Sequence, residues 1–245
     1  KADGKTALAP LLTPKGQVFG DLTVTRLSAD HYLMIGSPTA IVYYQRWFDR
    51  YRDGNVAIRD VTAEWTGFSL TGPKARAVLA ELVTEDISHQ AFPFLSARRM
   101  KVGLAEALVI RVSFTGELGY EIYTAPEFQL HVLQRLRAAG KAHGLKLCGM
   151  RALNALRLEK GYGSWGREFS VDYNPAEAGL GRFVRPEKGD FIGREAAQKI
   201  LATEPKRRLT IFALDAGKVD PMGNEPVLAN GEVVGRLTSG GFGYH

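Results

Sequence analysis

The sequence predicts an α+β protein, because patterns typical of strands and of helices follow each other in the order β-β-α, then β-β-α-β-β-β-α-α. Short runs rich in β-branched residues stand next to segments whose apolar residues recur every three or four positions. After Gly166 the helical signal fades, and strand-like runs separated by turn residues dominate from Lys206 onward. We therefore expect a larger mixed domain over residues 1–204 and the start of a small all-β domain over residues 205–245.

The first third of the chain is predicted to contain four strands, at residues 17–27, 32–35, 56–61 and 65–70. Ser37 and Pro38 are typical of a helix start, with serine as the N-cap and proline at the first position. This helix should end at Gly54. A second helix should open at Gly72-Pro73 and carry the apolar residues that follow.

The rest of the chain is assigned in the same way. Strands are expected within residues 100–112 with a break near Gly103, in a hairpin at residues 111–123, and at residues 206–214, 226–228 and 232–237. Helices are expected at residues 126–140, 150–160 and 194–200, with a further helix start at Pro175. The pair Asn230-Gly231 is typical of a two-residue hairpin turn.

Composition restricts the function classes. The chain has a net charge of +6, but its basic residues are scattered and form no long run, so we expect no nucleic-acid partner. No apolar run is long enough to span a bilayer and no signal-peptide pattern opens the chain, so we expect no membrane. A single cysteine, Cys148, excludes an internal disulfide and fits a cytoplasmic location, or the mitochondrial matrix in a eukaryote. Its apolar setting predicts burial.

The hairpin at residues 111–123 offers an aromatic surface next to carboxylates. Phe114 and Tyr120 share it with Glu117 and Glu121, and glycines allow a close approach to the backbone. A flat, nitrogen-rich ring could stack on the aromatic side chain and donate its N–H groups to a carboxylate. An ordinary hairpin with solvated glutamates is the alternative.

Asp21 interrupts an apolar, β-forming run at residues 18–24, where aspartate is disfavoured. One interpretation is an edge-strand residue that prevents aggregation. The other is a partly desolvated carboxylate with a raised pKa, which can exchange a proton with an amine. The sequence leaves both open.

A third polar region covers residues 151–168. Arg151, Asn154, Arg157 and Lys160 recur every three residues, and a solvated helix face is the default interpretation. Tyr162, Trp165 and Arg167 follow in a glycine-rich loop that suits an aromatic ligand with a carboxylate tail. The five histidines are isolated, so we expect no metal.

Six motifs in order carry a family resemblance. They are GDLTVT at residues 20–25, LTGP at 70–73, FTGELGYE at 114–121, ALRLEKG at 155–161, PAEAGL at 175–180 and DFIGREA at 190–196. Together they resemble the tetrahydrofolate-binding glycine cleavage T-protein (aminomethyltransferase) family. The last motif and the stretch WGRE at residues 165–168 are more similar to the folate-binding portion of dimethylglycine and sarcosine dehydrogenases.

The resemblance implies a role for each site residue. Asp21 matches the family's essential acid beside the folate nitrogens, and Glu121 matches the glutamate that binds the pterin. Phe114 stands where glycine cleavage enzymes have tyrosine, so stacking is kept and the hydroxyl is lost. Arg157 matches an arginine near the folate. Tyr120, Tyr162, Trp165 and Arg167 complete the set of expected folate-binding residues, and with Asp21 and Glu121 they are expected to surround one cavity.

The resemblance also implies a fold and an activity. The fold is a folate-binding core of two subdomains followed by a β-barrel, and here we expect the core to be truncated at its N-terminus and the barrel to be incomplete. The implied activity is transfer of a one-carbon unit from a methylated, glycine-type amine to tetrahydrofolate, which gives 5,10-methylenetetrahydrofolate. FAD is expected only if an upstream oxidase domain exists, and a flavin oxidoreductase domain or subunit is a possible partner. Alternatives are a folate-dependent demethylase of a methyl sulfonium or methyl ether, and a non-catalytic folate-binding module.

Overall fold

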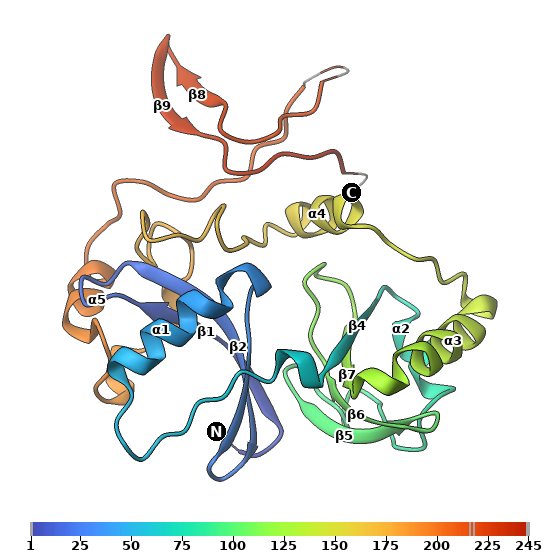
Figure 1. Ribbon diagram of the computed structural model, residues 1–245. Helices are drawn as coiled ribbons and strands as arrows, with labels where there is room; N and C mark the ends of the chain where they lie inside the picture. Colours follow the sequence, from blue (N-terminus) through green and yellow to red (C-terminus); the bar gives the residue numbers. More distant parts are fainter. Residues whose placement is uncertain (1, 216, 218, 244–245) are drawn as a thin grey trace. The chain divides into compact units, whose positions relative to one another are not determined.

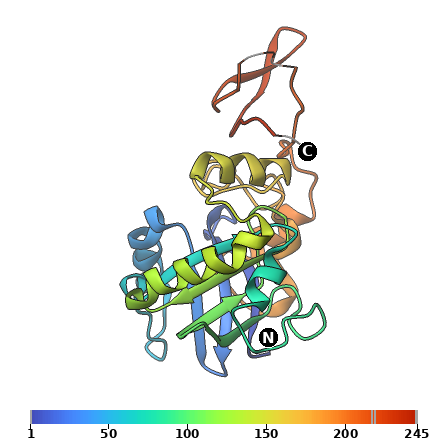
Figure 2. The ribbon, with the colours of Figure 1, turned by 90° about the vertical axis from the view of Figure 1, so that its right-hand side faces the viewer.

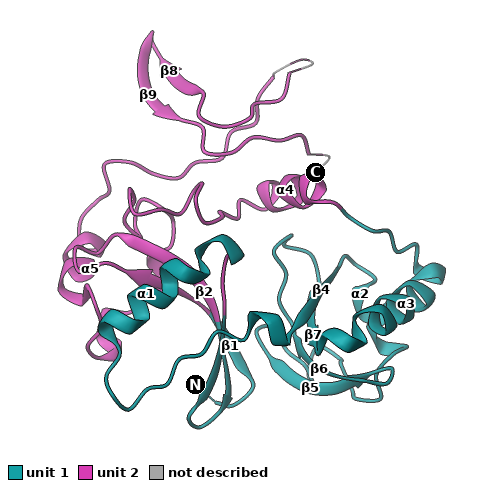
Figure 3. Ribbon diagram, in the orientation of Figure 1, with its two compact units in different colours: residues 1–7, 24–34, 38–148 teal, residues 8–23, 35–37, 149–245 magenta. Residues whose placement is uncertain are grey.

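A computed structural model describes residues 2–215, 217 and 219–243 and contains both helices and sheets, which confirms the α+β prediction (Figure 1). The chain divides into two compact units (Figure 3). The first unit holds residues 1–7, 24–34 and 38–148, and the second holds residues 8–23, 35–37 and 149–245.

A three-stranded sheet has the order β1-β2-β3, formed by β1 (Lys5–Leu12), β2 (Val18–Ser28) and β3 (His31–Ile35). Strands β2 and β3 were predicted within two residues at each end, but β1 was not. Pro10 explains why β1 lies at the edge of this sheet, because proline cannot donate a hydrogen bond to a second neighbour. Strand β2 is central, so the edge-strand interpretation of Asp21 is wrong.

The first unit contains a four-stranded antiparallel sheet of order β4-β7-β6-β5. Its strands are β4 (Thr66–Thr71), β5 (Ala97–Val102), β6 (Ala105–Ile110) and β7 (Gly119–Thr124). Helices α2 (Ala75–Ala80) and α3 (Gln129–Gly140) supply apolar residues to the core that this sheet shares. Figure 2 shows α3 lying across the strands of the sheet.

Alternation along β7 separates two kinds of side chain. Tyr120 and Ile122 are fully buried in the core with residues of α2 and α3. Glu121 and Tyr123 alternate with them along the strand and therefore lie on its opposite face. The prediction of paired strands around the hairpin is confirmed, because β6 and β7 pair antiparallel.

Helix α1 (Ile41–Tyr51) also belongs to the first unit and begins after a short 3-10 helix. The strand predicted at residues 56–61 is wrong, because this segment is irregular. Asp60 accounts for part of the difference: its carboxylate accepts a hydrogen bond from the Thr62 backbone N–H at 2.9 Å and so starts a turn. Short 3-10 helices cover Pro38–Ala40, Thr62–Glu64, Pro126–Phe128, Lys141–His143, Gly181–Phe183 and Pro186–Lys188.

The second unit carries α4 (Met150–Glu159), α5 (Arg194–Leu201) and the hairpin of β8 (Pro226–Ala229) and β9 (Glu232–Arg236). Asn230 and Gly231 both have positive φ, at 53° and 82°, which confirms the predicted two-residue turn.

Three other expectations are wrong. Residues 206–214 form no strand and are largely exposed. Pro175 lies in a turn rather than at a helix start, because the Asn174 side chain accepts hydrogen bonds from the next two backbone N–H groups that follow Pro175. Cys148 is exposed rather than buried, since it lies in the irregular segment that precedes α4.

Candidate functional site

The residues expected to bind folate fall into two groups, one in each unit. Phe114, Tyr120 and Glu121 belong to the first unit. Asp21 and the residues from Arg157 to Arg167 belong to the second. Each group is described within its own unit.

Glu121 lies near the middle of the four-stranded sheet, on the face opposite the core. It stands across from Ser69 on β4 and from Ile110 on β6. The hydroxyl of Tyr123, two residues further along the same face, donates a hydrogen bond of 2.7 Å to Glu121 Oε2. In the part of the chain that the structure describes, this is the only hydrogen bond to the carboxylate, so Oε1 remains available as an acceptor.

Burial raises the pKa of Glu121, and the hydrogen bond from Tyr123 partly opposes that increase. The pKa of Tyr123 is also raised, by burial first and then by the negative charge of Glu121 and the hydrogen bond to it. Tyr123 therefore stays protonated at any physiological pH and acts as a permanent donor. This arrangement suits a ligand that offers N–H groups to the second carboxylate oxygen.

The loop between β6 and β7, residues 111–118, holds Phe114 with 38% of its surface exposed. Hydroxyl groups of buried and half-buried residues anchor the loop: Thr71 Oγ1 lies 2.6 Å from Thr115 Oγ1 and 3.1 Å from Ser113 Oγ. A Cβ atom at Gly119 would lie 2.5 Å from the Ser113 Cβ, so only glycine allows the loop to fold back here. The loop thus presents an aromatic ring from a rigid base.

Tyr120 does not share the face of Glu121. Its side chain has no exposed surface, stacks against Phe92 at a centroid distance of 6.0 Å and accepts a hydrogen bond from Arg76 Nε. Strand alternation is the reason, because adjacent residues on a strand point to opposite faces. The structure gives Tyr120 a packing role, and we leave it out of the proposed ligand contacts.

Asp21 lies on the central strand β2, half-buried between the buried residues Gly20 and Leu22. Burial raises its pKa to about 6, and a hydrogen bond from its own backbone N–H opposes the increase. Within the described chain no other residue donates a hydrogen bond to the carboxylate. The group can therefore exchange a proton close to neutral pH.

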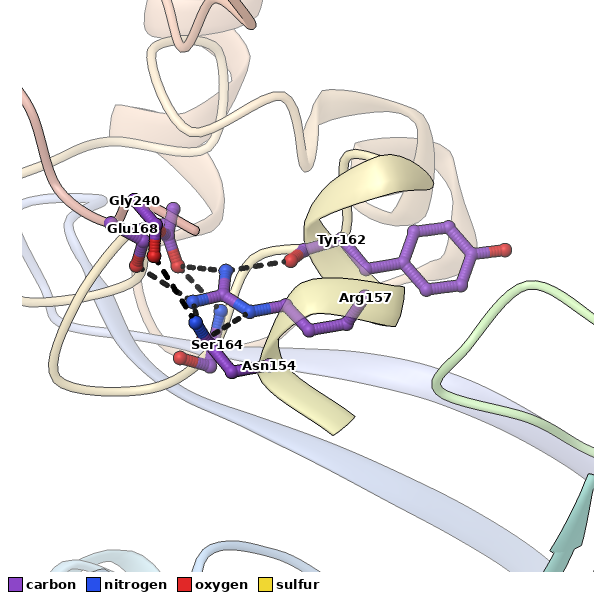
Figure 4. A network of polar contacts seen from close by, with 7 residues as sticks. Asn154, Arg157, Tyr162, Ser164, Glu168 and Gly240 are labelled. Atoms are coloured by element: carbon purple, nitrogen blue, oxygen red, sulfur yellow. Dashed lines mark hydrogen bonds and ion pairs between the residues drawn. The ribbon is translucent and has the colours of Figure 1, made fainter. Parts of the chain in front are cut away.

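Arg157 lies at the centre of a polar network in the second unit (Figure 4). It is only 1% exposed, so the expectation of a solvated helix face is wrong at this position. Its Nη1 atom donates to Glu168 Oε2 at 2.8 Å and to the Tyr162 carbonyl at 2.9 Å. Its Nη2 donates to Ser239 Oγ at 2.7 Å and to Asn154 Oδ1 at 2.8 Å, and Nε donates to the same amide oxygen.

These bonds use all five N–H groups of Arg157 and leave none for a ligand in this arrangement. Burial would raise the pKa of Glu168, but hydrogen bonds from Ser239, the Ser164 backbone and Thr238, together with the charge of Arg157, lower it. The pair therefore stays ionised. It joins α4 to the segment that follows β9.

Sequence reasoning missed Glu168 as the partner of Arg157. The partner is 11 residues away, and no periodicity distinguishes a buried glutamate from a solvated one in a glycine-rich loop. Gly163 is the available hint: a Cβ atom there would lie 2.5 Å from the Phe169 ring, which shows how closely this loop folds on itself.

The remaining expected contacts differ in accessibility. In Figure 4 the Tyr162 ring points away from the network around Arg157. Trp165 is half-buried against the apolar cluster of Val18, Phe169, Ala178 and Leu180. Arg167 is exposed. Their contact with a ligand stays a prediction.

Two features are absent from the part of the chain that the structure describes. No group of three or more histidine, cysteine, aspartate or glutamate side chains there is placed to hold a metal ion. No helix among those residues is long and apolar enough to cross a membrane.

The chain is similar in sequence to known proteins. Over 245 aligned residues the chain is 40% identical to human mitochondrial dimethylglycine dehydrogenase, covering 98% of this chain and 28% of that protein. It is 35% identical to an aminomethyltransferase from Caldanaerobacter subterraneus over 228 residues, which cover 93% of this chain and 60% of that protein. The chain thus spans less than a third of the dehydrogenase.

A solved structure has a similar fold. Aminomethyltransferase T of the Bartonella henselae glycine cleavage system matches 98% of this chain and 65% of its own, with a TM-score of 0.82 at 23% identity. This likeness confirms the predicted fold. Residues 1–188 match the GCVT N-terminal domain, and residues 207–245 match the glycine cleavage T-protein C-terminal barrel domain. The chain therefore belongs to the glycine cleavage T-protein family, as its six motifs predicted.

Proposed function

We propose that this chain catalyses tetrahydrofolate-dependent transfer of a one-carbon unit from a methylated, glycine-type amine. Membership of the T-protein family and the likeness to dimethylglycine dehydrogenase and an aminomethyltransferase support the reaction class. The observation that carries the proposal is the carboxylate of Asp21, placed on a central strand with a pKa raised to about 6. We also propose that the folate-binding domain covers residues 1–204 and that the barrel domain starts at residue 205.

The residues of the first unit fit a reduced pterin. Glu121 offers one carboxylate oxygen to the N–H groups of the ring, and the partly exposed Phe114 is the residue proposed to stack on it. When bound, tetrahydrofolate supplies the nitrogen atoms that accept the one-carbon unit as 5,10-methylenetetrahydrofolate. The protein residues hold the ring in one orientation, which removes much of the entropic barrier to the transfer.

Asp21 is the proposed proton carrier. Its carboxylate accepts a proton from an amine and returns it, and a pKa near the working pH makes both directions accessible. Tyr162, Trp165 and Arg167 are proposed as further contacts of the ligand in the second unit. Arg157 contributes by holding this loop in place through its network rather than through a free N–H group.

The amine has to reach this chain in an oxidised, iminium form, because a methyl group on an unoxidised amine has no electrophilic carbon to transfer. We therefore propose a flavin oxidoreductase domain or subunit, which would carry FAD, as the partner that supplies it. The match to dimethylglycine dehydrogenase supports this class of partner. A cytoplasmic or mitochondrial location also stays a proposal.

The test is Asp21→Asn in the complete protein that carries this chain. We expect folate to bind with unchanged affinity and the formation of 5,10-methylenetetrahydrofolate to fall by at least 10²-fold, in the range that general acid–base groups contribute. Asp30→Asn is the matched control, because Asp30 is exposed in the turn between β2 and β3. Unchanged turnover in Asp21→Asn would exclude the mechanism. A 5-methyl product would indicate the demethylase instead, and folate binding without any transfer would indicate a binding module.

A further inference from the structure

We propose that Tyr123 is a positioning residue that fixes the Glu121 carboxylate for its folate ligand, an inference that rests on the function proposed above. The family motif at residues 114–121 ends before this tyrosine. The structure assigns it a role through two contacts, one with Glu121 and one with Gly67.

The first contact orients the carboxylate. Tyr123 and Glu121 are two residues apart on one face of β7, and the hydroxyl donates to Oε2 at 2.7 Å. Because this bond occupies Oε2, the other oxygen is presented to a ligand in one orientation. A hydrogen bond to a charged acceptor is roughly twice as strong as one between neutral groups, so it can hold the rotamer.

The second contact orients the tyrosine ring. Gly67 on β4 stands directly opposite Tyr123, and a Cβ atom at Gly67 would lie 3.0 Å from the ring. The ring therefore lies over the backbone of β4, in space that any larger residue would take. The glycine on β4, the tyrosine on β7 and the carboxylate together form a built arrangement rather than a chance surface contact.

On β4 and β6 no charged residue stands directly opposite Glu121 or Tyr123. The residues directly opposite Glu121 and Tyr123 on the neighbouring strands are uncharged: Ser69 and Gly67 on β4, and Ile110 and Leu108 on β6. Charged residues on this face lie further away: Glu106 on β6 pairs with Lys101 on β5, and Arg99 on β5 stands opposite Leu108. The only group in the described chain that lowers the pKa of Glu121 is Tyr123. Loss of the hydroxyl should therefore make Glu121 easier to protonate.

The experiment is Tyr123→Phe in the complete protein, with 5-formyltetrahydrofolate as a stable reduced-folate probe. We expect the dissociation constant at pH 7 to rise about tenfold, which corresponds to about 1.4 kcal/mol. We also expect the pH below which binding weakens to move upward, since a protonated Glu121 is a poorer acceptor. Tyr173→Phe is the matched control, because the Tyr173 hydroxyl accepts a hydrogen bond from Arg236 in the second unit.

A double-mutant cycle with Glu121→Gln separates positioning from packing. If Tyr123 acts through the carboxylate, adding Tyr123→Phe to Glu121→Gln should shift no pH midpoint and weaken binding further by less than threefold. Equal losses in both backgrounds, or unchanged affinity at every pH in the single variant, would overturn the proposal.

A measurement made without ligand distinguishes a failure of this proposal from a failure of the proposed function. Carbon-13 NMR of the Glu121 carboxyl should show a higher pKa in Tyr123→Phe than in the unmodified protein. If the pKa does not change, the positioning role fails even when folate binds. If the pKa rises but the unmodified protein binds no folate, the proposed function fails, and the role of Tyr123 toward folate fails with it.

Discussion

Asp21→Asn should stabilise the folded chain at alkaline pH, because the native structure holds this carboxylate in a place that disfavours its charge. The pKa is raised from 3.8 to about 6. A shift of roughly two units corresponds to about 3 kcal/mol at 1.36 kcal/mol per unit, as an order of magnitude. The folded state binds the proton more tightly than the unfolded state, so the stability of the unmodified chain falls as pH rises from about 4 to about 6.

Urea unfolding of both proteins across pH 3 to 8 measures this effect. Above pH 6 the unmodified chain carries the full cost of the buried charge, and the asparagine variant, which cannot ionise, should be up to about 3 kcal/mol more stable. The difference should shrink towards zero below pH 4, where the aspartate is neutral in both states. A difference that does not change with pH, or a less stable variant at pH 8, would refute the reasoning. Asp30→Asn, which changes an exposed aspartate in the turn between β2 and β3, is the control.

Three further predictions concern the remaining parts of the two units. Glu168→Gln should destabilise the chain by about 3–5 kcal/mol in urea unfolding, because the buried Arg157 charge loses its counter-ion. Gly119→Ala should cost about 1–3 kcal/mol by thermal unfolding, because the new Cβ would overlap the Ser113 side chain. Phe114→Ala should weaken folate binding by about 0.5–1.5 kcal/mol in calorimetric titration, through loss of stacking.

Each of these has a control or an outcome that would contradict it. For Gly119→Ala, a melting temperature equal to that of the unmodified chain would show that the clash does not occur. Phe94→Ala removes a more exposed phenylalanine ring from another loop and should leave folate affinity unchanged. An equal loss in Phe94→Ala and Phe114→Ala would contradict a specific stacking role. For Glu168→Gln, a stability within 1 kcal/mol of the unmodified chain would contradict the buried ion pair.

Local patterns were sufficient wherever alternation or turn chemistry decides the structure. The pairing of β6 with β7 and the Asn230-Gly231 turn were predicted from period-two patterning and from residues that tolerate positive φ. Local patterns failed where partners that are distant in the sequence decide the structure. Strand β1 contains Pro10 and shows no clear alternation, and it becomes a strand because β2 is available as its neighbour.

The predictions for the candidate site succeeded and failed for the same reasons. Asp21 could be singled out because a carboxylate within a β-forming run conflicts with local propensity, and such conflicts concentrate at functional positions. Arg157 was misjudged, because its burial depends on Ser239, which is 82 residues away in sequence. Tyr123 was passed over as an ordinary strand aromatic, since its contact with Glu121 requires knowledge of its side-chain rotamer.

Binding of 5-formyltetrahydrofolate to the complete protein and to its Glu121→Ala variant tests the central claim most directly, by isothermal titration calorimetry at pH 7.5. We predict saturable binding with one site per chain, and a loss of at least tenfold in affinity when the carboxylate is removed. Equal affinity of the two proteins, or no binding to the unmodified one, would contradict the account.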